Sequence, residues 1–247
     1  MILPIILNVA NKNMYKVAVV IPCYNEEKNI SEVIRSVHRV NHSSLYQLIP
    51  IVVNDKSTDR SSDIASKENC VLLDLPVNLG IGGAVQSGFK YAVVNDFDAA
   101  IQMDGDGQHP AEEIEKILSP LMNDDADVII GSRFITGEGF QSSFWRRVGI
   151  GFFKLLLKRI TGQTITDSTS GFRAVNRKTL AIIAHQYPDD YPEPVAIVIF
   201  SKNNLKMKEV QVEMKERQGG QSTIGGVSSM YYMIKVSLSI CFTYFKK

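Results

Sequence analysis

Cysteine, net charge and long apolar runs are all scarce in this sequence. The three cysteines, Cys23, Cys70 and Cys241, lie far apart in 247 residues and lack the spacing of a zinc site. We therefore expect reduced thiols in a cytosolic setting rather than a disulfide framework. The formal net charge of +1, from 27 basic and 26 acidic side chains, argues against a general nucleic-acid binder. The apolar start, Met1–Leu7, contains Pro4; it is too short to span a bilayer and poor as a secretion signal.

Apolar strand patterns alternate with helical patterns through the first half of the chain. The strand patterns cover residues 16–21, 49–53, 71–75, 99–103 and 127–130. Between them, apolar residues recur at spacings of three and four, as in Ile30, Val33, Ile34 and Val37. This alternation predicts one α/β domain with a doubly wound, mainly parallel sheet flanked by helices. Such sheets bind ligands outside the carboxyl ends of their strands.

The second half of the chain is less regular. We expect a basic amphipathic helix over residues 144–160, a turn into a short strand at 170–173, a helix over 196–202 and a strand over 207–212. Apolar residues from Ser228 onward predict a final amphipathic helix. The expected organisation is an accessory segment at residues 1–13, one domain at 14–227 and a C-terminal helix at 228–247.

Two aspartates separated by one glycine follow the fourth of the apolar runs. Asp104 and Asp106 project to the same side of an extended backbone, where like charges resist joint ionisation. Mg²⁺ or Mn²⁺ relieves this repulsion, because such ions take oxygen ligands and can share them with a diphosphate. The alternative is an ordinary surface turn, since Asp and Gly are common turn residues. Asp55 and Arg133 also follow expected strands, and this convergence at one sheet edge favours the metal site.

Three other features allow more than one interpretation. The run Gly80-Ile81-Gly82-Gly83 suggests a dinucleotide loop, but it follows the third expected strand and lacks the complete Gly-x-Gly-x-x-Gly pattern, so a turn for close helix packing is favoured. His109 is either a metal ligand or a residue at a helix start. Glu26 either favours a helix N-terminus or contacts a nucleotide.

Seven short motifs occur in an order that resembles the family-2 glycosyltransferases with the GT-A fold. They are Val20–Glu26, Val53–Asp55 with Ser57–Asp59, Asn78–Gly80, Asp104–Pro110, Gly131–Arg133, Thr169–Arg173 and Arg217–Gly220. The resemblance runs from about Val17 to the C-terminus. Within the family, the chain is most similar to the branch of polyprenyl-phosphate and dolichyl-phosphate sugar synthases.

The resemblance implies a role for each matched position. The donor nucleotide sugar would be bound by Pro22, Tyr24, Glu26, Val53, Asp55, Gly80 and Gly105. Asp104 and Asp106 would place Mg²⁺ or Mn²⁺ on the donor diphosphate, with Gln108 near the metal. Arg133 and Arg217 would face phosphates of the donor or of a lipid-phosphate acceptor, joined by Arg146 or Arg147.

The implied reaction is a direct displacement that inverts the anomeric carbon. The departing nucleoside diphosphate gains negative charge, which a metal ion and guanidinium groups stabilise. A phosphate acceptor needs little basic help, whereas a hydroxyl acceptor needs a general base. Glu193 is the best candidate for that base, and Asp167 is either the reserve candidate or a ligand of the acceptor. Two positions depart from the family pattern: relatives carry a second acid at Val195, and usually Gly or Asn at Lys56.

The resemblance also indicates the partners. The donor would be a UDP-, GDP- or dTDP-sugar, and the acceptor a polyprenyl phosphate or a lipid-linked surface glycan at the cytoplasmic face of the membrane. The helices expected at 144–160 and 228–247 fit peripheral attachment to that membrane, or packing on a second copy of the chain. A sugar-nucleotide pyrophosphorylase is disfavoured, because the glycine- and arginine-rich loop of those enzymes is missing after the first strand. A catalytically silent nucleotide-sugar-binding or scaffold subunit remains the alternative.

Overall fold

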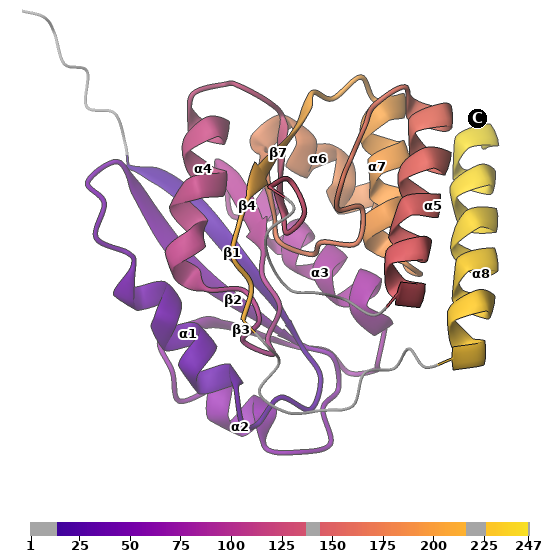
Figure 1. Cartoon of the computed structure of the whole chain (residues 1–247). Coiled ribbons are helices and arrows are strands. Elements are labelled where there is room, and N and C mark those ends of the chain that lie inside the picture. The colour runs from indigo at the N-terminus through magenta and orange to yellow at the C-terminus, as the bar shows by residue number, and fades with distance from the viewer. Residues whose placement is uncertain (1–13, 137–143, 216–225, 247) are drawn as a thin grey trace, which may run out of the picture.

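In the computed structural model, one mixed sheet lies between two layers of helices (Figure 1). The structure describes residues 14–136, 144–215 and 226–246, without the side chains of residues 144–150 and 226–232. The strands are β1 (Tyr15–Cys23), β2 (Tyr46–Asn54), β3 (Val71–Asp74), β4 (Ala99–Gln102), β5 (Val128–Ser132), β6 (Arg173–Asn176) and β7 (Met207–Gln211). The helices are α1 (Ile30–Arg39), α2 (Ser61–Ala65), α3 (Gly80–Val94), the short 3₁₀ turn η1 (Ala111–Glu113), α4 (Ile114–Met122), α5 (Phe144–Thr161), α6 (Arg177–Gln186), α7 (Pro192–Lys202) and α8 (Gly226–Phe245).

The sheet is mainly parallel, as predicted, with one reversed strand. Its strand order is β3-β2-β1-β4-β6-β5-β7. β6 runs antiparallel to β4 and β5, while the other neighbouring pairs are parallel. The reversed strand therefore begins at the edge where the parallel strands end, and Arg173 pairs with Gln102 there. The loop that enters β6 thus lies beside the loop that leaves β4.

Alternate residues of the central strands face two separate cores. Val17, Val19 and Ile21 of β1 pack with α1, α2 and α4, whereas Ala18 and Val20 pack with α3, α5, α6, α7 and α8. Strands buried on both faces need apolar residues at successive positions, which explains the continuous runs in the sequence. In Figure 1, α5, α7 and α8 stand side by side on one flank of the molecule.

Two helices differ from the sequence-based expectation. α6 was not predicted, although the Asn176 side chain accepts a hydrogen bond from Thr179 N and caps its first turn. The helix expected at residues 196–202 begins earlier, with Pro192 in its first turn, a position that proline tolerates because the N–H groups there have no helical partner. As a result, Glu193 lies in the first turn of α7 rather than in a loop.

Candidate active site

The two aspartates lie in a turn packed against the end of β1. β4 ends at Gln102, and the chain then leaves the sheet through Asp104 and Asp106. A Cβ atom on Gly105 would lie 2.9 Å from the carbonyl oxygen of Pro22, so no larger residue fits without a shift. The turn and the β1 end are therefore in direct contact, which brings residues from two predicted motifs together.

The Asp104 carboxylate lies close to a histidine ring and to the loop that enters β6. Its side chain is 35% exposed, and Oδ2 lies 3.8 Å from Nε2 of His109. A Cβ atom on Gly171 would lie 3.1 Å from Oδ1 and 3.4 Å from Oδ2 of Asp104. The reversed direction of β6 produces this contact, because it delivers Gly171 to the carboxyl edge.

His109 is buried below this turn and is not a metal ligand in this arrangement. Its Nδ1 accepts a hydrogen bond of 3.0 Å from the backbone N–H of Asp104, so the proton of the neutral ring is on Nε2 and neither nitrogen can coordinate an ion. Burial lowers the pKa of His109 to about 4, against the opposing effect of Asp106. The ring stacks on Phe172, with 5.1 Å between the ring centroids.

Asp106 and Gln108 connect the turn to the segment that follows β7. Asp106 Oδ1 accepts a hydrogen bond from the backbone N–H of Gln108. The backbone N–H of Lys215 donates to the Gln108 carbonyl at 2.9 Å. The chain after β7 therefore reaches the aspartate turn at Lys215. The predicted phosphate contact Arg217 lies outside the described residues, and the side chains of Arg146 and Arg147 are not described either.

The loops that follow β1 and β2 are joined by hydrogen bonds. The Asn25 backbone N–H donates to Ser57 Oγ at 3.0 Å, and Thr58 N donates to Asn25 Oδ1 at 2.8 Å. Glu26 N donates to Ser61 Oγ at 2.8 Å. These contacts fix the two loops as one unit, which carries the predicted nucleoside contacts.

Those predicted contacts differ in accessibility. Tyr24 is 51% exposed, whereas Asp55 is 3% exposed and the Val53 side chain lies in the core. The Asp55 carboxylate accepts hydrogen bonds from the backbone N–H groups of Leu79, at 2.6 Å, and Gly80, at 2.9 Å. Asp55 thus caps the N-terminus of α3, where a negative charge is favourable. Its contact with a nucleoside stays a prediction.

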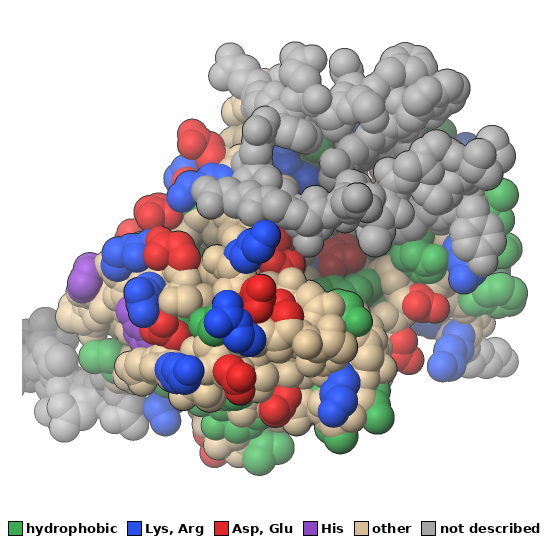
Figure 2. All heavy atoms as spheres, turned by 90° about the horizontal axis from the view of Figure 1, so that it is seen from below, with side chains coloured by type: hydrophobic (Ala, Val, Ile, Leu, Met, Phe, Trp, Pro, Cys, Tyr) green, Lys and Arg blue, Asp and Glu red, His purple; other side chains and the backbone are tan. Residues whose placement is uncertain are grey.

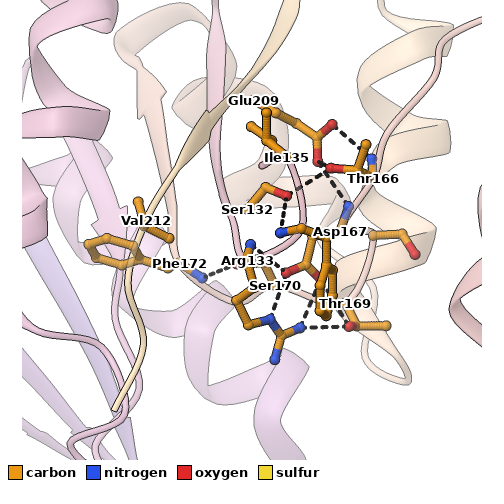
Figure 3. A network of polar contacts seen from close by, with 12 residues as sticks. Ser132, Arg133, Ile135, Thr166, Asp167, Thr169, Ser170, Phe172, Glu209 and Val212 are labelled. Atoms are coloured by element: carbon orange, nitrogen blue, oxygen red, sulfur yellow. Dashed lines mark hydrogen bonds and ion pairs between the residues drawn. The ribbon is translucent and has the colours of Figure 1, made fainter. Parts of the chain in front are cut away.

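Arg133 follows β5 and is held by an ion pair with Asp167 (Figure 3). Its Nε donates to Asp167 Oδ2 at 2.7 Å and its Nη2 to Oδ1 at 2.8 Å, while Nη2 also donates to Thr169. Burial lowers the pKa of Arg133, but the ion pair with Asp167 and the nearby charge of Asp104 outweigh burial and raise it. Asp167 is fully buried, so this geometry makes it the anchor of Arg133 and not an accessible base.

Glu209 of β7 holds the segment at Thr166 and Asp167, next to the ion pair with Arg133 (Figure 3). Its carboxylate accepts hydrogen bonds from the backbone N–H and hydroxyl of Thr166, at 2.7 and 2.9 Å, and from the backbone N–H of Asp167, at 2.9 Å. The Thr166 hydroxyl also lies 2.8 Å from that of Ser132. β5, β7 and the 166–170 loop are thereby joined through buried polar contacts.

Glu193 reaches the carboxyl edge from the start of α7. Gln102 Nε2 donates to Glu193 Oε1 at 3.4 Å, and Gln102 Oε1 accepts from Tyr187 at 2.7 Å. Arg173 donates to the Glu193 backbone carbonyl at 2.8 Å. Burial raises the pKa of Glu193, and the charge of Asp104 adds to this rise while Arg173 opposes it. The partly buried carboxyl group is therefore a better proton acceptor than an ordinary surface glutamate.

A groove adjoins the start of α7. Its volume is about 300 Å³, and it is lined by Asp190, Tyr191, Lys235, Leu238, Ser239, Phe242 and Thr243. Leu238 and Phe242 of α8 are exposed large apolar side chains. Figure 2, which views the molecule from below, shows acidic and basic side chains interspersed over the carboxyl-edge loops, with acidic groups also in a recess beside the residues drawn in grey.

Comparison with known proteins identifies the family. The model of glycosyl transferase family 2 matches residues 18–182. The chain belongs to this family. Its activity is therefore that of a glycosyltransferase, and the prediction of an enzyme is confirmed.

Two curated relatives of this family-2 glycosyltransferase act on polyprenyl-type lipids, by their names. The UDP-N-acetylglucosamine–dolichyl-phosphate N-acetylglucosaminyltransferase of Methanococcus voltae is 30% identical over 227 residues, which cover 83% of this chain and 86% of the relative. The polyprenol monophosphomannose synthase of Mycolicibacterium smegmatis is 28% identical over 229 residues, covering 89% and 84%. The predicted similarity to the polyprenyl-phosphate and dolichyl-phosphate sugar synthases is thus confirmed.

The fold of this family-2 chain matches solved GT-A structures. Glucosyl-3-phosphoglycerate synthase from Mycobacterium tuberculosis, solved with Mn²⁺, UDP-glucose and phosphoglyceric acid, superposes with a TM-score of 0.69 over 93% of this chain and 79% of that one. At 18% identity, this similarity supports the fold alone. The prediction of a GT-A fold is confirmed.

The sequence analysis assigned no role to three polar residues that organise the site of this glycosyltransferase. They are Gln102, Arg173 and Glu209, and each lies within or at the end of a strand. Gln102 interrupts the apolar run of residues 99–103, which was the available signal. A buried polar group in a strand needs partners, and those partners here come from distant segments. The role of such a residue becomes visible only when the strand neighbours are known.

Proposed function

We propose that this family-2 glycosyltransferase moves a sugar from a nucleotide-diphosphate sugar to a polyprenyl phosphate or a lipid-linked glycan, with inversion and with help from Mg²⁺ or Mn²⁺. One observation carries the proposal. Asp104, Arg133 and Glu193 arrive from β4, β5 and α7 and gather at the carboxyl edge of the sheet. This brings together a carboxylate pair, a guanidinium group and a candidate base, as the transfer reaction requires.

The oxygen ligands that the two aspartates offer suit a hard divalent cation. Within the described ranges, no group of three or more His, Cys, Asp and Glu side chains gathers that could enclose a metal. Mg²⁺ is often held by one or two carboxylates together with substrate phosphates and waters, so Asp104 and Asp106 suffice. When bound, the ion would neutralise charge on the leaving diphosphate. We assign Gln108 the role of fixing Asp106 through its backbone N–H.

We assign the donor to the joined loops after β1 and β2. Tyr24 offers an exposed aromatic face for a nucleoside, Glu26 lies on the same loop, and Pro22 lies near the end of β1 just before it. Arg133 would meet a phosphate, because the ion pair with Asp167 fixes its guanidinium group close to Asp104. The donor would be a UDP-, GDP- or dTDP-sugar, since the described contacts do not distinguish between these nucleobases.

Two observations support a lipid-phosphate acceptor. The relatives are named for dolichyl-phosphate and polyprenol substrates. In this chain, the groove with Leu238 and Phe242 adjoins the start of α7, where Glu193 lies. A phosphate acceptor is already an anion, so Glu193 would act as the base only towards a hydroxyl acceptor.

We also propose attachment to the inner face of the cell membrane through α8. None of the described helices is both long enough and apolar enough to cross a bilayer. α8 begins at Gly226 and packs on α7 and α5, with Val236 and Ile240 in the core and other apolar side chains exposed. We therefore regard residues 14–227 as the catalytic domain and residues 228–247 as its membrane-facing helix.

Transfer assays with a sugar-nucleotide panel test the proposed function. UDP-, GDP- and dTDP-sugars are incubated with Mn²⁺, a short polyprenyl phosphate and either the wild-type chain or Asp106→Ala. We expect transfer from one donor and a loss of about 100-fold or more in the variant, because leaving-group charge is no longer stabilised. Asp63→Ala, an exposed acid of α2, is the control and should keep full activity. Donor binding without transfer by the wild-type chain would favour a silent subunit.

A further inference from the structure

We infer that His109 is a positioning residue that holds Asp104 in the orientation needed to bind a divalent cation. The inference rests on the proposed function, because it assumes that Asp104 and Asp106 receive the metal. It assigns His109 a role through Asp104 and not through the metal itself. The residue comes five positions after Asp104, beyond the turn, and its ring folds back underneath it.

The ring contacts Asp104 at the backbone and approaches its side chain. The Asp104 N–H donates to Nδ1 at 3.0 Å. Since a backbone N–H can only donate, Nδ1 is the acceptor and the proton of the ring is on Nε2. Nε2 of His109, which carries this proton, lies 3.8 Å from Asp104 Oδ2. One imidazole therefore fixes the main chain at Asp104 and presents a donor group towards the carboxylate.

The ring is itself held in place. His109 is 4% exposed and stacks on Phe172 with 24° between the ring planes. Phe172 is fully buried, and the adjacent Gly171 also lies against the Asp104 carboxylate. The β6 loop and the histidine thus both limit the movement of this carboxylate.

This confinement matters because the aspartate turn contains two glycines. Gly105 and Gly107 add backbone freedom, and Gly107 has a positive φ of 78°. Mg²⁺ demands oxygen ligands in near-ideal octahedral geometry. A turn that sampled several conformations would present Asp104 and Asp106 correctly for only part of the time. The hydrogen bond to His109 removes that freedom on the Asp104 side.

Two substitutions at position 109 distinguish the contribution of the hydrogen bond to Mn²⁺ binding from that of the aromatic ring. His109→Phe keeps a stacking ring but removes the acceptor. His109→Asn removes the ring but places an amide oxygen where Nδ1 was. Mn²⁺ alone is titrated into the full chain, and free Mn²⁺ is measured by electron paramagnetic resonance. We expect His109→Phe to weaken Mn²⁺ binding by about tenfold or more, as loss of an outer partner of a metal ligand does. His109→Asn should stay within about threefold of the wild type.

Phe200→Leu is the matched control for packing. Phe200 is a buried residue of α7 in the core on the opposite face of the sheet from Phe172, so the change lowers the melting temperature but leaves the stacked ring and the Asp104 hydrogen bond in place. Mn²⁺ affinity should be unchanged in this variant. If Mn²⁺ affinity follows melting temperature across the three variants, His109 is merely structural and the inference is wrong. If the wild-type chain and His109→Phe bind Mn²⁺ equally, only this inference fails. If the wild-type chain binds no Mn²⁺ without a donor, this inference fails, whereas the proposed metal site fails only if sugar transfer also proceeds without a divalent cation.

Discussion

At the scale of single residues, backbone conformation shows what the departure of Lys56 from the family pattern costs. Lys56 follows Asp55 and has a positive φ of 60°, in the left-handed region. Its side chain is exposed, so nothing in the core requires a lysine there. The glycine or asparagine that the family pattern favours would adopt this conformation more easily. The departure is therefore a local cost in stability.

Lys56→Gly should stabilise the protein by roughly 0.5 kcal/mol. Relief of the left-handed strain gives about 1 kcal/mol or more, and the greater freedom of glycine in the unfolded chain offsets part of it. Lys90→Gly, at an exposed position in α3, is the control and should destabilise by about 1 kcal/mol. Urea unfolding curves measure both changes. A loss of stability in Lys56→Gly would show that the lysine makes a contact that outweighs the strain.

Glu193 gives a pH-dependent prediction at the same scale. Because its pKa is raised on folding, the folded state binds a proton more tightly than the unfolded state. Its contribution to stability is therefore present below the unfolded pKa and is lost as the pH rises through the folded pKa. Glu193→Gln, which cannot ionise, should melt roughly 2–4 °C higher than the wild type at neutral pH, about the shift for 1 kcal/mol in a chain of this length.

The difference in melting temperature between Glu193→Gln and the wild type should vanish in acid, where the Glu193 carboxyl group of the wild type is protonated and therefore uncharged as well. Thermal unfolding from neutral pH down to about pH 4 follows this change. Glu32→Gln is a useful contrast, because the hydrogen bond from Arg39 lowers the pKa of Glu32. That substitution should not raise the melting temperature at neutral pH. An equal difference between Glu193→Gln and wild type at all pH values would contradict the assignment of a raised pKa.

At the scale of elements, the strands and their ends could be predicted, but their pairing could not. The runs at residues 16–21 and 99–103 became β1 and β4, and Asp55, Asp104 and Arg133 do follow strands. The reversal of β6 was not visible, because the direction of a short strand depends on partners distant in sequence. The capping role of Asp55 was hidden for the same reason. A carboxylate after a strand could serve a ligand or a helix N-terminus, and local sequence does not separate the two.

Glu209 shows how one strand side chain organises a distant loop. Glu209→Gln would keep one acceptor oxygen but turn the other into a donor that faces a backbone N–H. We expect a loss of about 2 kcal/mol in the free energy of unfolding, in the range for hydrogen bonds to a charged group. Glu213→Gln, an exposed acid four residues later, should cost less than about 0.5 kcal/mol. Denaturant unfolding measures both. Equal effects would mean that Glu209 does not anchor the 166–167 backbone.

At the scale of the whole molecule, the surface is electrically balanced but unevenly apolar. The net charge is +1, and basic and acidic groups are mixed over the face in Figure 2. Exposed large apolar side chains, in contrast, recur along α8 at Ile234, Leu238, Phe242 and Phe245. Their spacing of three to four residues places them on one stripe of the helix. This stripe lies on the flank formed by α5, α7 and α8 in Figure 1.

Such a stripe beside lysines suits an anionic lipid surface, because apolar burial and charge attraction act together. Lys235 and Lys246 lie on α8 or directly after it. The wild-type chain should therefore sediment with phosphatidylcholine vesicles that contain phosphatidylglycerol, more weakly with vesicles that lack it, and should be released by salt. The double variant Phe242→Ser, Phe245→Ser should bind about 30-fold more weakly or worse, since each buried phenylalanine contributes on the order of 1 kcal/mol or more and about 1.4 kcal/mol is a factor of ten.

Val94→Ser is the matched control, because Val94 is an exposed apolar residue at the end of α3 and away from the stripe. It should sediment like the wild type. If the α8 variant also sediments like the wild type, the stripe does not contact lipid. Concentration-dependent self-association that the α8 variant abolishes would then assign the stripe to packing between two copies of the chain. The same pair of variants therefore separates the two roles that an exposed apolar helix face can have in this molecule.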